Sequence, residues 1–208
     1  MENPVRSRAR RGAHTPRGQQ TRSAILAAAR QMCREKWLDQ LSLAELARVA
    51  GTTRASVLFQ FPDGWLDLAA ELLVEEMTIA RSATEEIAKL RLKPPERLSR
   101  SVHYFLQRGE ELGALMPNVR AFNYFWGDMI DALVAPARDA AFDAVARLLQ
   151  ATAPGRQSTA EARYAAETLV FFSIDLACAP MYRRLRPAER AAKLDTAIGL
   201  VVKGLTRG

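Results

Sequence analysis

Residues 41–61 read LSLAELARVAGTTRASVLFQF, a stretch that predicts two short helices joined by a tight turn. Ser42 and Glu45 have the spacing of a capping box, so the first helix is expected to begin at about Leu43. Gly51 can adopt the left-handed conformation that ends a helix without a steric penalty. This one stretch therefore predicts a helix, a turn and the start of a second helix.

The second helix is expected over about residues 54–59, because Thr52 or Thr53 can cap it. Its predicted inward residues are Ala55, Val57 and Leu58. The residues expected to stay available to the outside are Arg54, Ser56, Phe59 and Gln60. This is the plan of a helix-turn-helix motif, whose second helix enters the major groove of DNA. Helical hairpins that bind nothing can show the same pattern. Whether this one binds DNA therefore has to be judged from the neighbouring sequence.

Residues 21–68 resemble the DNA-binding domain of the tetracycline-repressor (TetR) family of bacterial regulators. The matching segments are TRSAILAAARQMCREKWLDQ, then LSLAELARVAGTTRASVLFQF, then FPDGWLDLAAELL. The positions of the family pattern A-x-x-A-G-V-S-x-x-x-L-Y-x-x-F are occupied here by Ala47, Ala50, Gly51, Thr52, Thr53, Val57, Leu58 and Phe61. The resemblance implies an all-α fold, with a three-helix helix-turn-helix domain at residues 21–66 and a larger helical ligand-binding and dimerisation domain at residues 67–208.

Three positions depart from the family pattern. Leu58 replaces a usual Tyr and Gly64 a usual Lys, and both usual residues commonly touch the DNA backbone. Trp37 replaces a common Gly at the end of the first helix. The Gly64 amide could still bind a phosphate at the start of the fourth helix, which Asp63 is expected to cap. The motif is thus expected to form with two phosphate contacts missing.

The net charge of +7 and the pI of about 9.9 favour a polyanionic partner, either nucleic acid or a membrane surface. Much of the charge lies near the N-terminus, in Arg6, Arg8, Arg10, Arg11, Arg17 and Arg22. Residues 1–20 are predicted to form a disordered basic arm. The arm is either a solubilising tail or a segment that binds phosphates or the minor groove, with Arg8, Arg10 and Arg11 as candidate contacts.

The resemblance implies a homodimer on a near-palindromic double-stranded DNA operator, with half-sites about 34–36 Å apart. Candidates for contacts with base edges are Arg54, Ser56 and Gln60, since Arg pairs with guanine and Gln with adenine. Candidates for positioning the phosphates are Ser42, Thr53, Phe59 and the amide of Gly64.

A long helix is expected from Asp63 to about Leu92, ended by two prolines. Residues 96–152 predict three helices, broken near residues 113–117 and near Gly127, with a kink at Pro136. Their large side chains indicate either plain core or a pocket for a small hydrophobic or amphipathic inducer, which the resemblance implies. The candidate ligand-binding residues are His103, Gln107, Phe122, Asn123, Tyr124, Trp126 and Met129.

A second capping box, Ser158 with Glu161, predicts a helix over residues 159–184, and a last helix is expected over residues 188–205. The segment LVFFSIDLACAPM is apolar on nearly every side but too short to span a membrane. The resemblance implies a four-helix dimer interface, with candidates Leu169, Phe172, Leu176, Leu194, Ile198 and Val201. A monomer with a deep core is the alternative. Asp175 is expected to pair or to stay protonated.

Catalysis, cofactors and metals are not expected. Cys33 and Cys178 are isolated in apolar patterns, which indicates buried, reduced thiols without metal-ligand spacing. His14 and His103 lie in unrelated segments, and no glycine-rich phosphate loop follows a strand. The sequence thus predicts a ligand-responsive regulator, most simply a repressor, in the bacterial cytoplasm. The alternatives are a ligand-independent nucleoid-type DNA binder, or a helical protein-interaction dimer that has lost operator binding.

Overall fold

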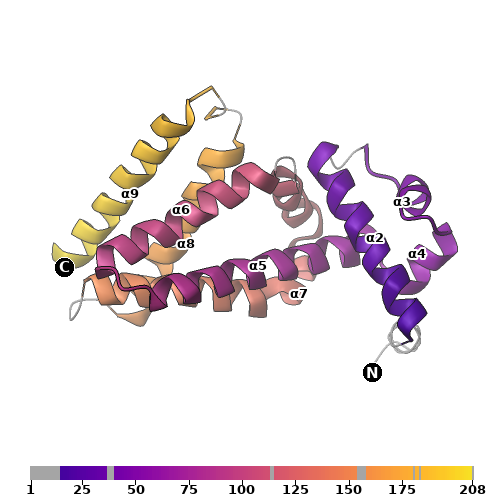
Figure 1. Ribbon diagram of the computed structural model, residues 1–208, viewed down its shortest axis with the longest axis horizontal. Coiled ribbons are helices and arrows are strands. Elements are labelled where there is room, and N and C mark those ends of the chain that lie inside the picture. The colour runs from indigo at the N-terminus through magenta and orange to yellow at the C-terminus, as the bar shows by residue number, and fades with distance from the viewer. Residues whose placement is uncertain are drawn as a thin grey trace. The chain divides into compact units, whose positions relative to one another are not determined.

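The computed structural model describes residues 15–36, 40–112, 115–153, 158–179, 181–182 and 184–207, and only the backbone of residues 115–126 and 207. Within these ranges the chain forms eight helices and no strand (Figure 1). The helices are α2 Pro16–Glu35, α3 Leu43–Val49, α4 Arg54–Gln60, α5 Trp65–Lys89, α6 Pro94–Leu112, α7 Leu115–Thr152, α8 Thr159–Cys178 and α9 Pro187–Arg207. The predicted all-α fold is confirmed.

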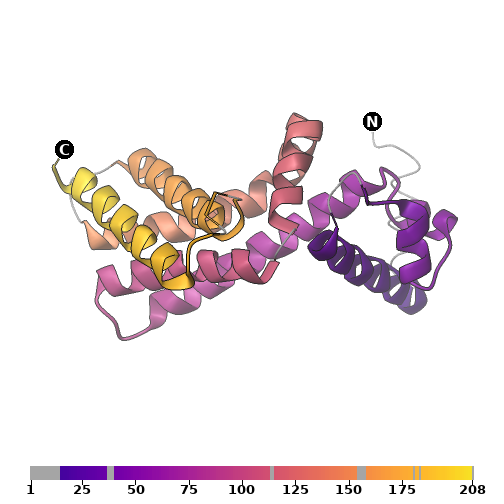
Figure 2. The same ribbon diagram turned by 90° about the horizontal axis from the view of Figure 1, so that it is seen from above.

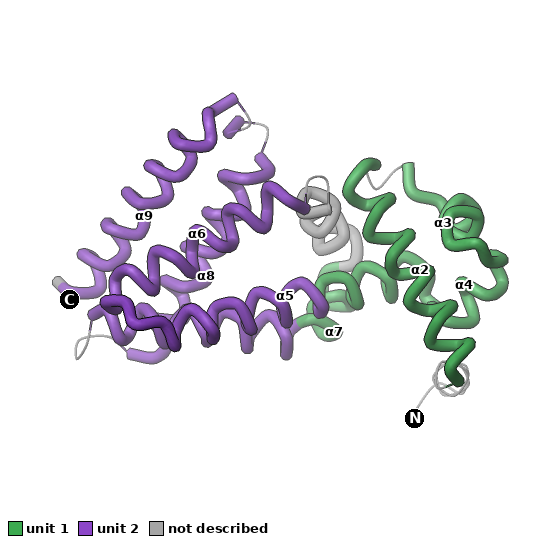
Figure 3. The backbone as a smooth tube through the Cα atoms, viewed as in Figure 1, with its two compact units in different colours: residues 1–73, 117–134 green, residues 74–116, 135–208 purple. Residues whose placement is uncertain are grey.

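The chain divides into two compact units (Figure 3). Unit 1 contains residues 1–73 and 117–134, and unit 2 contains residues 74–116 and 135–208. α5 therefore begins in unit 1 and continues into unit 2, whereas α7 begins in unit 2, contributes residues 117–134 to unit 1 and returns to unit 2. α5 is the first of the two along the chain, and it starts directly after the helix-turn-helix segment.

In unit 1, α2 begins at Pro16 rather than at Thr21. The Thr15 hydroxyl accepts a hydrogen bond from the Gly18 amide at 3.0 Å, and proline is tolerated at the first helical position because that position needs no N–H partner. Residues 16–20, expected in the basic arm, are therefore helical. The buried side of α2 consists of Ile25, Ala28, Ala29, Met32 and Cys33, as its apolar periodicity indicates.

In unit 2, α6 packs against α8 and α9, and α8 also packs against α9 (Figure 2). The approach of α6 to α8 is close at Gly109, where an added Cβ would lie 2.7 Å from the Cβ of Ala177. Pro94 is the first residue of α6. Proline is tolerated there because the N–H of the first helical residue has no partner within the helix. α8 ends at Cys178, earlier than the expected residue 184.

α7 is interrupted at Gly127, whose φ of 38° and ψ of −120° are not helical. This confirms the predicted break near that glycine. Pro136 also lies inside α7. The residue of α7 whose backbone angles are not helical is Gly127 and not Pro136. In the described part of the chain, none of the helices has the length and apolar character needed to cross a bilayer.

Candidate nucleic-acid interface

α3 begins as the sequence predicts. The Ser42 hydroxyl accepts a hydrogen bond from the Glu45 amide at 3.1 Å and caps the helix. The Glu45 carboxylate binds the Lys36 ammonium at 2.6 Å instead of returning to Ser42. This hydrogen bond from Lys36 lowers the pKa of Glu45 below its ordinary value. The Lys36 pair thus connects the end of α2 to the start of α3.

The turn between α3 and α4 depends on Gly51, whose φ of +64° lies in the left-handed region. The Thr52 amide then donates to the Ala47 carbonyl at 2.9 Å, which satisfies a carbonyl at the end of α3. Thr53 caps α4, because its hydroxyl accepts from the Ser56 amide at 3.1 Å. The predicted helix-turn-helix geometry is present.

The orientation of α4 differs from the predicted one. Gln60 is 7% exposed and Val57 is fully buried, whereas Ala55 is exposed. Leu58 and Phe59 are 36% and 49% exposed. The prediction that Gln60 faces outward is wrong, as is the inward placement of Ala55 and Leu58. Val57 and Gln60 are three residues apart and share the inner face of the helix, so the next residues along the chain point outward.

Gln60 is held where α2, α4 and α5 meet. The guanidinium of Arg22 donates to the Gln60 main-chain oxygen at 2.7 Å and to the Glu71 carboxylate at 2.5 Å. The same guanidinium lies 4.2 Å from the centre of the Phe61 ring. The Gln60 side-chain oxygen is buried without a hydrogen-bond partner among the described residues. A side chain in this position supports the packing of unit 1 and cannot reach a base edge.

Gly64 also lies differently from the prediction. Its amide donates to the Phe61 carbonyl at 2.9 Å, so it is already engaged and the expected phosphate contact is wrong. Gly64 is buried with a φ of +62°, and an added Cβ would meet Leu43 Cδ1 at 3.2 Å. A side chain at this position would strain both the backbone and the packing under α3.

Exposed positive charge lies on both helices of the motif. Arg48 near the end of α3 and Arg54 at the start of α4 are exposed. Arg48 is 3.8 Å from the Glu45 carboxylate, at the limit of an ion pair. Arg8, Arg10 and Arg11 of the predicted arm lie outside the described residues.

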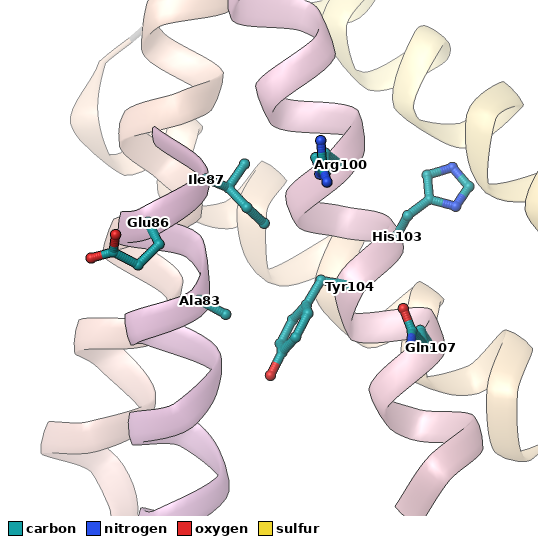
Figure 4. A pocket seen from close by; sticks show the side chains of 7 residues that line it. All are labelled: Ala83, Glu86, Ile87, Arg100, His103, Tyr104 and Gln107. Atoms are coloured by element: carbon teal, nitrogen blue, oxygen red, sulfur yellow. The ribbon is translucent and has the colours of Figure 1, made fainter. Parts of the chain in front are cut away.

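The two described ligand candidates of α6, His103 and Gln107, border an open groove of about 470 Å³ in unit 2 (Figure 4). The groove lies between α5 and α6 and is lined by Ala83, Glu86, Ile87, Arg100, His103, Tyr104 and Gln107. Burial raises the pKa of the Tyr104 hydroxyl, which therefore stays protonated and can donate. His103 also hydrogen-bonds Asp195 of α9 at 2.8 Å. The groove therefore combines charged and polar side chains with the apolar Ala83 and Ile87 and the ring of Tyr104.

Among the other ligand candidates only Met129 has a described side chain, and it does not line this groove. The side chains of Phe122, Asn123, Tyr124 and Trp126 lie outside the described residues. Met129 is exposed and belongs to unit 1. Tyr104 was not among the sequence candidates, although its aromatic ring beside His103 was visible in the sequence.

Four of the candidate dimer residues are already buried within the single chain, namely Leu169, Leu176, Leu194 and Ile198. They have no surface left to bury against a partner, so their assignment to the interface is wrong. Phe172 and Val201 remain partly exposed. Because α8 is apolar on nearly every side, its sequence left open which side faces its own chain. In the structure the side that carries Leu169 and Leu176 packs against α6 and α9.

The exposed apolar side of α8 carries Tyr164, 71% exposed, and Phe171, 46% exposed. Leu200 of α9 is 66% exposed. Asp175 is half-buried and lies on the same side of α8 as Tyr164 and Phe171, since the spacings of seven and eleven residues return to one face. Asp175 is therefore placed at the surface of unit 2 and not in its apolar core.

These features define an all-α protein in which a helix-turn-helix unit is followed by a helical unit. A protein from Mesorhizobium loti, provisionally assigned to the TetR-family transcriptional regulators, has the same fold, with a TM-score of 0.62. The match covers 98% of each chain at 16% sequence identity, a level that shows the fold alone. No protein-family model matches the chain, and no curated protein matches it. Among the described residues, no three His, Cys, Asp or Glu side chains gather as metal ligands would.

Proposed function

We propose that this protein is a transcriptional regulator of the TetR type that binds an operator as a homodimer and is released by a small-molecule ligand. The observation that carries the proposal is the α3–turn–α4 geometry, in which capped helices present an exposed Arg48 near the end of α3 and an exposed Arg54 at the start of α4. A helix presented in this way fits the major groove. The fold shared with the Mesorhizobium loti protein supports it. Catalysis forms no part of the proposal.

In this proposal Arg54 and Ser56 approach base edges, while Ser42 and Thr53 stand at helix starts and position phosphates. Arg48, which was not among the candidates from the sequence, adds a phosphate contact. Arginines of the N-terminal arm would supply further charge, replacing the Lys that is missing at Gly64.

Dimerisation through the exposed apolar side of α8 and α9 would bury Tyr164, Phe171 and Leu200 against the same residues of a second copy. A two-fold interface uses one patch on both subunits, so each of these side chains contributes twice. Two recognition helices related by such an axis read half-sites about 34–36 Å apart, which explains why the operator is expected to be near-palindromic.

The groove between α5 and α6 is the proposed site for a small amphipathic ligand. Tyr104 and His103 supply hydrogen-bonding groups beside the apolar Ile87 and Ala83. α5 begins after the helix-turn-helix segment, and its first residues belong to unit 1. A ligand in the groove would therefore contact a helix that the two units share. Such a ligand releases DNA only if it binds the two states with different affinity.

The test is selection of bound duplexes from a random DNA pool at near-physiological salt. An enriched near-palindrome would support a dimeric sequence reader, and loss of that enrichment in Arg54→Ala would assign the contact to α4. Retention without any motif, falling steeply with salt, would favour the nucleoid-type alternative, which the +7 charge supports. Failure to bind any duplex at low salt would favour a protein-interaction dimer.

A further inference from the structure

The outward face of α4 is mainly apolar. Successive residues of a helix are rotated by about 100°, so Ala55 lies opposite the buried pair Val57 and Gln60, with Leu58 and Phe59 on either side of it. Leu58 is 36% and Phe59 49% exposed. None of these three side chains has a hydrogen-bond donor or acceptor. The face therefore cannot bind phosphates or read the hydrogen-bonding edge of a base.

We propose that Leu58 and Phe59 recognise thymine through its C5-methyl group in the major groove. This inference rests on the proposed function and specifies what the recognition helix reads. Thymine is the one DNA base that presents a methyl group in the major groove, and apolar side chains are its usual partners. The methyl group lies on one strand of the pair, so the contact distinguishes T·A from A·T and from both G·C orientations.

Two features of unit 1 favour DNA as the occupant of this face. Arg54 adjoins it at the start of α4 and Arg48 is exposed near the end of α3, and positive charge near an apolar strip suits a groove bordered by phosphates. The face is also small, since α4 is a seven-residue helix. A stable protein–protein interface needs about 20–30 residues on each side, far more than this strip provides.

The inference also reassigns Phe59. The phosphate contact expected of this residue is not open to it, because a phenylalanine ring has no group to donate to a phosphate. Burial of its exposed half against a methyl group instead removes apolar surface of both partners from water. Leu58 stands where the resembled family usually has a Tyr that touches the DNA backbone. In this proposal the residue at this position contacts a base instead.

The experiment uses the full-length protein and the duplex enriched in the selection above. Each thymine is replaced in turn by deoxyuridine, which removes only the methyl group and keeps the base pair. At one or two positions per half-site the wild type should bind about fourfold more weakly, as expected for about 0.8 kcal/mol per methylene-sized group. Replacements outside the contacted positions should leave binding unchanged.

Variants assign the contact to side chains. Leu58→Ala and Phe59→Ala should each bind the thymine and deoxyuridine duplexes with equal affinity at one position, because the partner of that methyl group is gone. Both residues are exposed, so the variants should melt at the wild-type temperature. Arg54→Ala is the matched control, since it should weaken binding to both duplexes by the same factor.

Equal binding of wild type to thymine and deoxyuridine at every position would overturn the inference while leaving the proposed function in place. Methyl dependence that persists in both alanine variants would overturn the assignment to Leu58 and Phe59. Selection that enriches no duplex would overturn the proposed function itself, and the methyl readout with it.

Discussion

Arg108 of α6 donates to both carboxylate oxygens of Glu76 on α5, at 3.1 Å and 2.9 Å, and the Glu76 side chain is only 6% exposed. A paired geometry of this kind compensates the loss of water around the carboxylate. Within unit 2 the pair joins α5 to α6, the two helices that line the candidate ligand groove.

Arg108→Met should therefore be strongly destabilising, by about 3–5 kcal/mol, because it removes the Arg108 charge that compensates the buried Glu76 carboxylate. Urea unfolding of the full chain measures the change. Arg81→Met is the matched control: its pair with Glu85 is exposed and spans one helical turn, and its loss should cost about 0.5 kcal/mol or less. Similar losses in the two variants would contradict the structural role of the buried pair.

Arg22→Met should loosen the end of α4. The substitution removes the hydrogen bond to the Gln60 carbonyl and the ion pair with Glu71, and hydrogen bonds from a charged group contribute about 1.5–3 kcal/mol. Faster hydrogen exchange at the amides of α4 is the expected observation. Arg17→Met, a change at an exposed position in the first turn of α2, should leave that exchange unaltered.

Three Gly→Ala substitutions should rank in a defined order. Gly64→Ala should destabilise most, because the new Cβ is strained by the left-handed backbone and also crowds Leu43. Gly51→Ala has only the strain of the left-handed backbone, which costs about 1–2 kcal/mol. Gly199→Ala lies in α9 with open space around it and should stabilise by about 0.5–1 kcal/mol. Thermal melting of the three variants gives the order, and a Gly64→Ala variant as stable as wild type would contradict the packing under α3.

The start of α8 should make stability depend on pH. The Glu161 carboxylate accepts from the Ser158 amide at 2.7 Å, and this bond lowers the pKa of Glu161 below its ordinary 4.5. A lowered folded-state pKa adds stability above pH 4.5, and that stability is lost as the pH falls through the folded-state value. The stability difference between wild type and Glu161→Gln should therefore shrink on going from pH 7 to pH 3. A difference that is constant over this range would count against the carboxylate as its source.

Phe171→Glu and Leu200→Glu should each convert the proposed dimer into a monomer without unfolding the chain, because both side chains are exposed in the single chain. Sedimentation velocity and the thermal melt report the two properties separately. Leu90→Glu, a similarly exposed leucine at the end of α5, should remain dimeric. Leu194→Glu should instead unfold the chain, since Leu194 is fully buried. A dimer that persists in both of the first two variants would place the interface elsewhere.

The sequence alone determined the elements whose signals lie within a few residues. Ser42, Thr53 and Ser158 each cap the helix that their spacing predicts, and the Gly51 turn is where its backbone freedom requires it. These interactions are local hydrogen bonds and backbone preferences, so the residues that make them are neighbours in the chain. The all-α fold and the helix-turn-helix order follow from such signals.

Only the tertiary structure decided which way the helices face. In the seven-residue α4, Leu58 and Gln60 exchange their expected places because Arg22 of α2, far away in the sequence, holds the carboxyl end of that helix. In α8, apolar on nearly every side, α6 and α9 take Leu169 and Leu176 into the core and leave Tyr164 and Phe171 at the surface. A helix with apolar residues on several faces has several nearly equivalent orientations. The choice between them comes from burial against residues far away in the sequence, which no local pattern encodes.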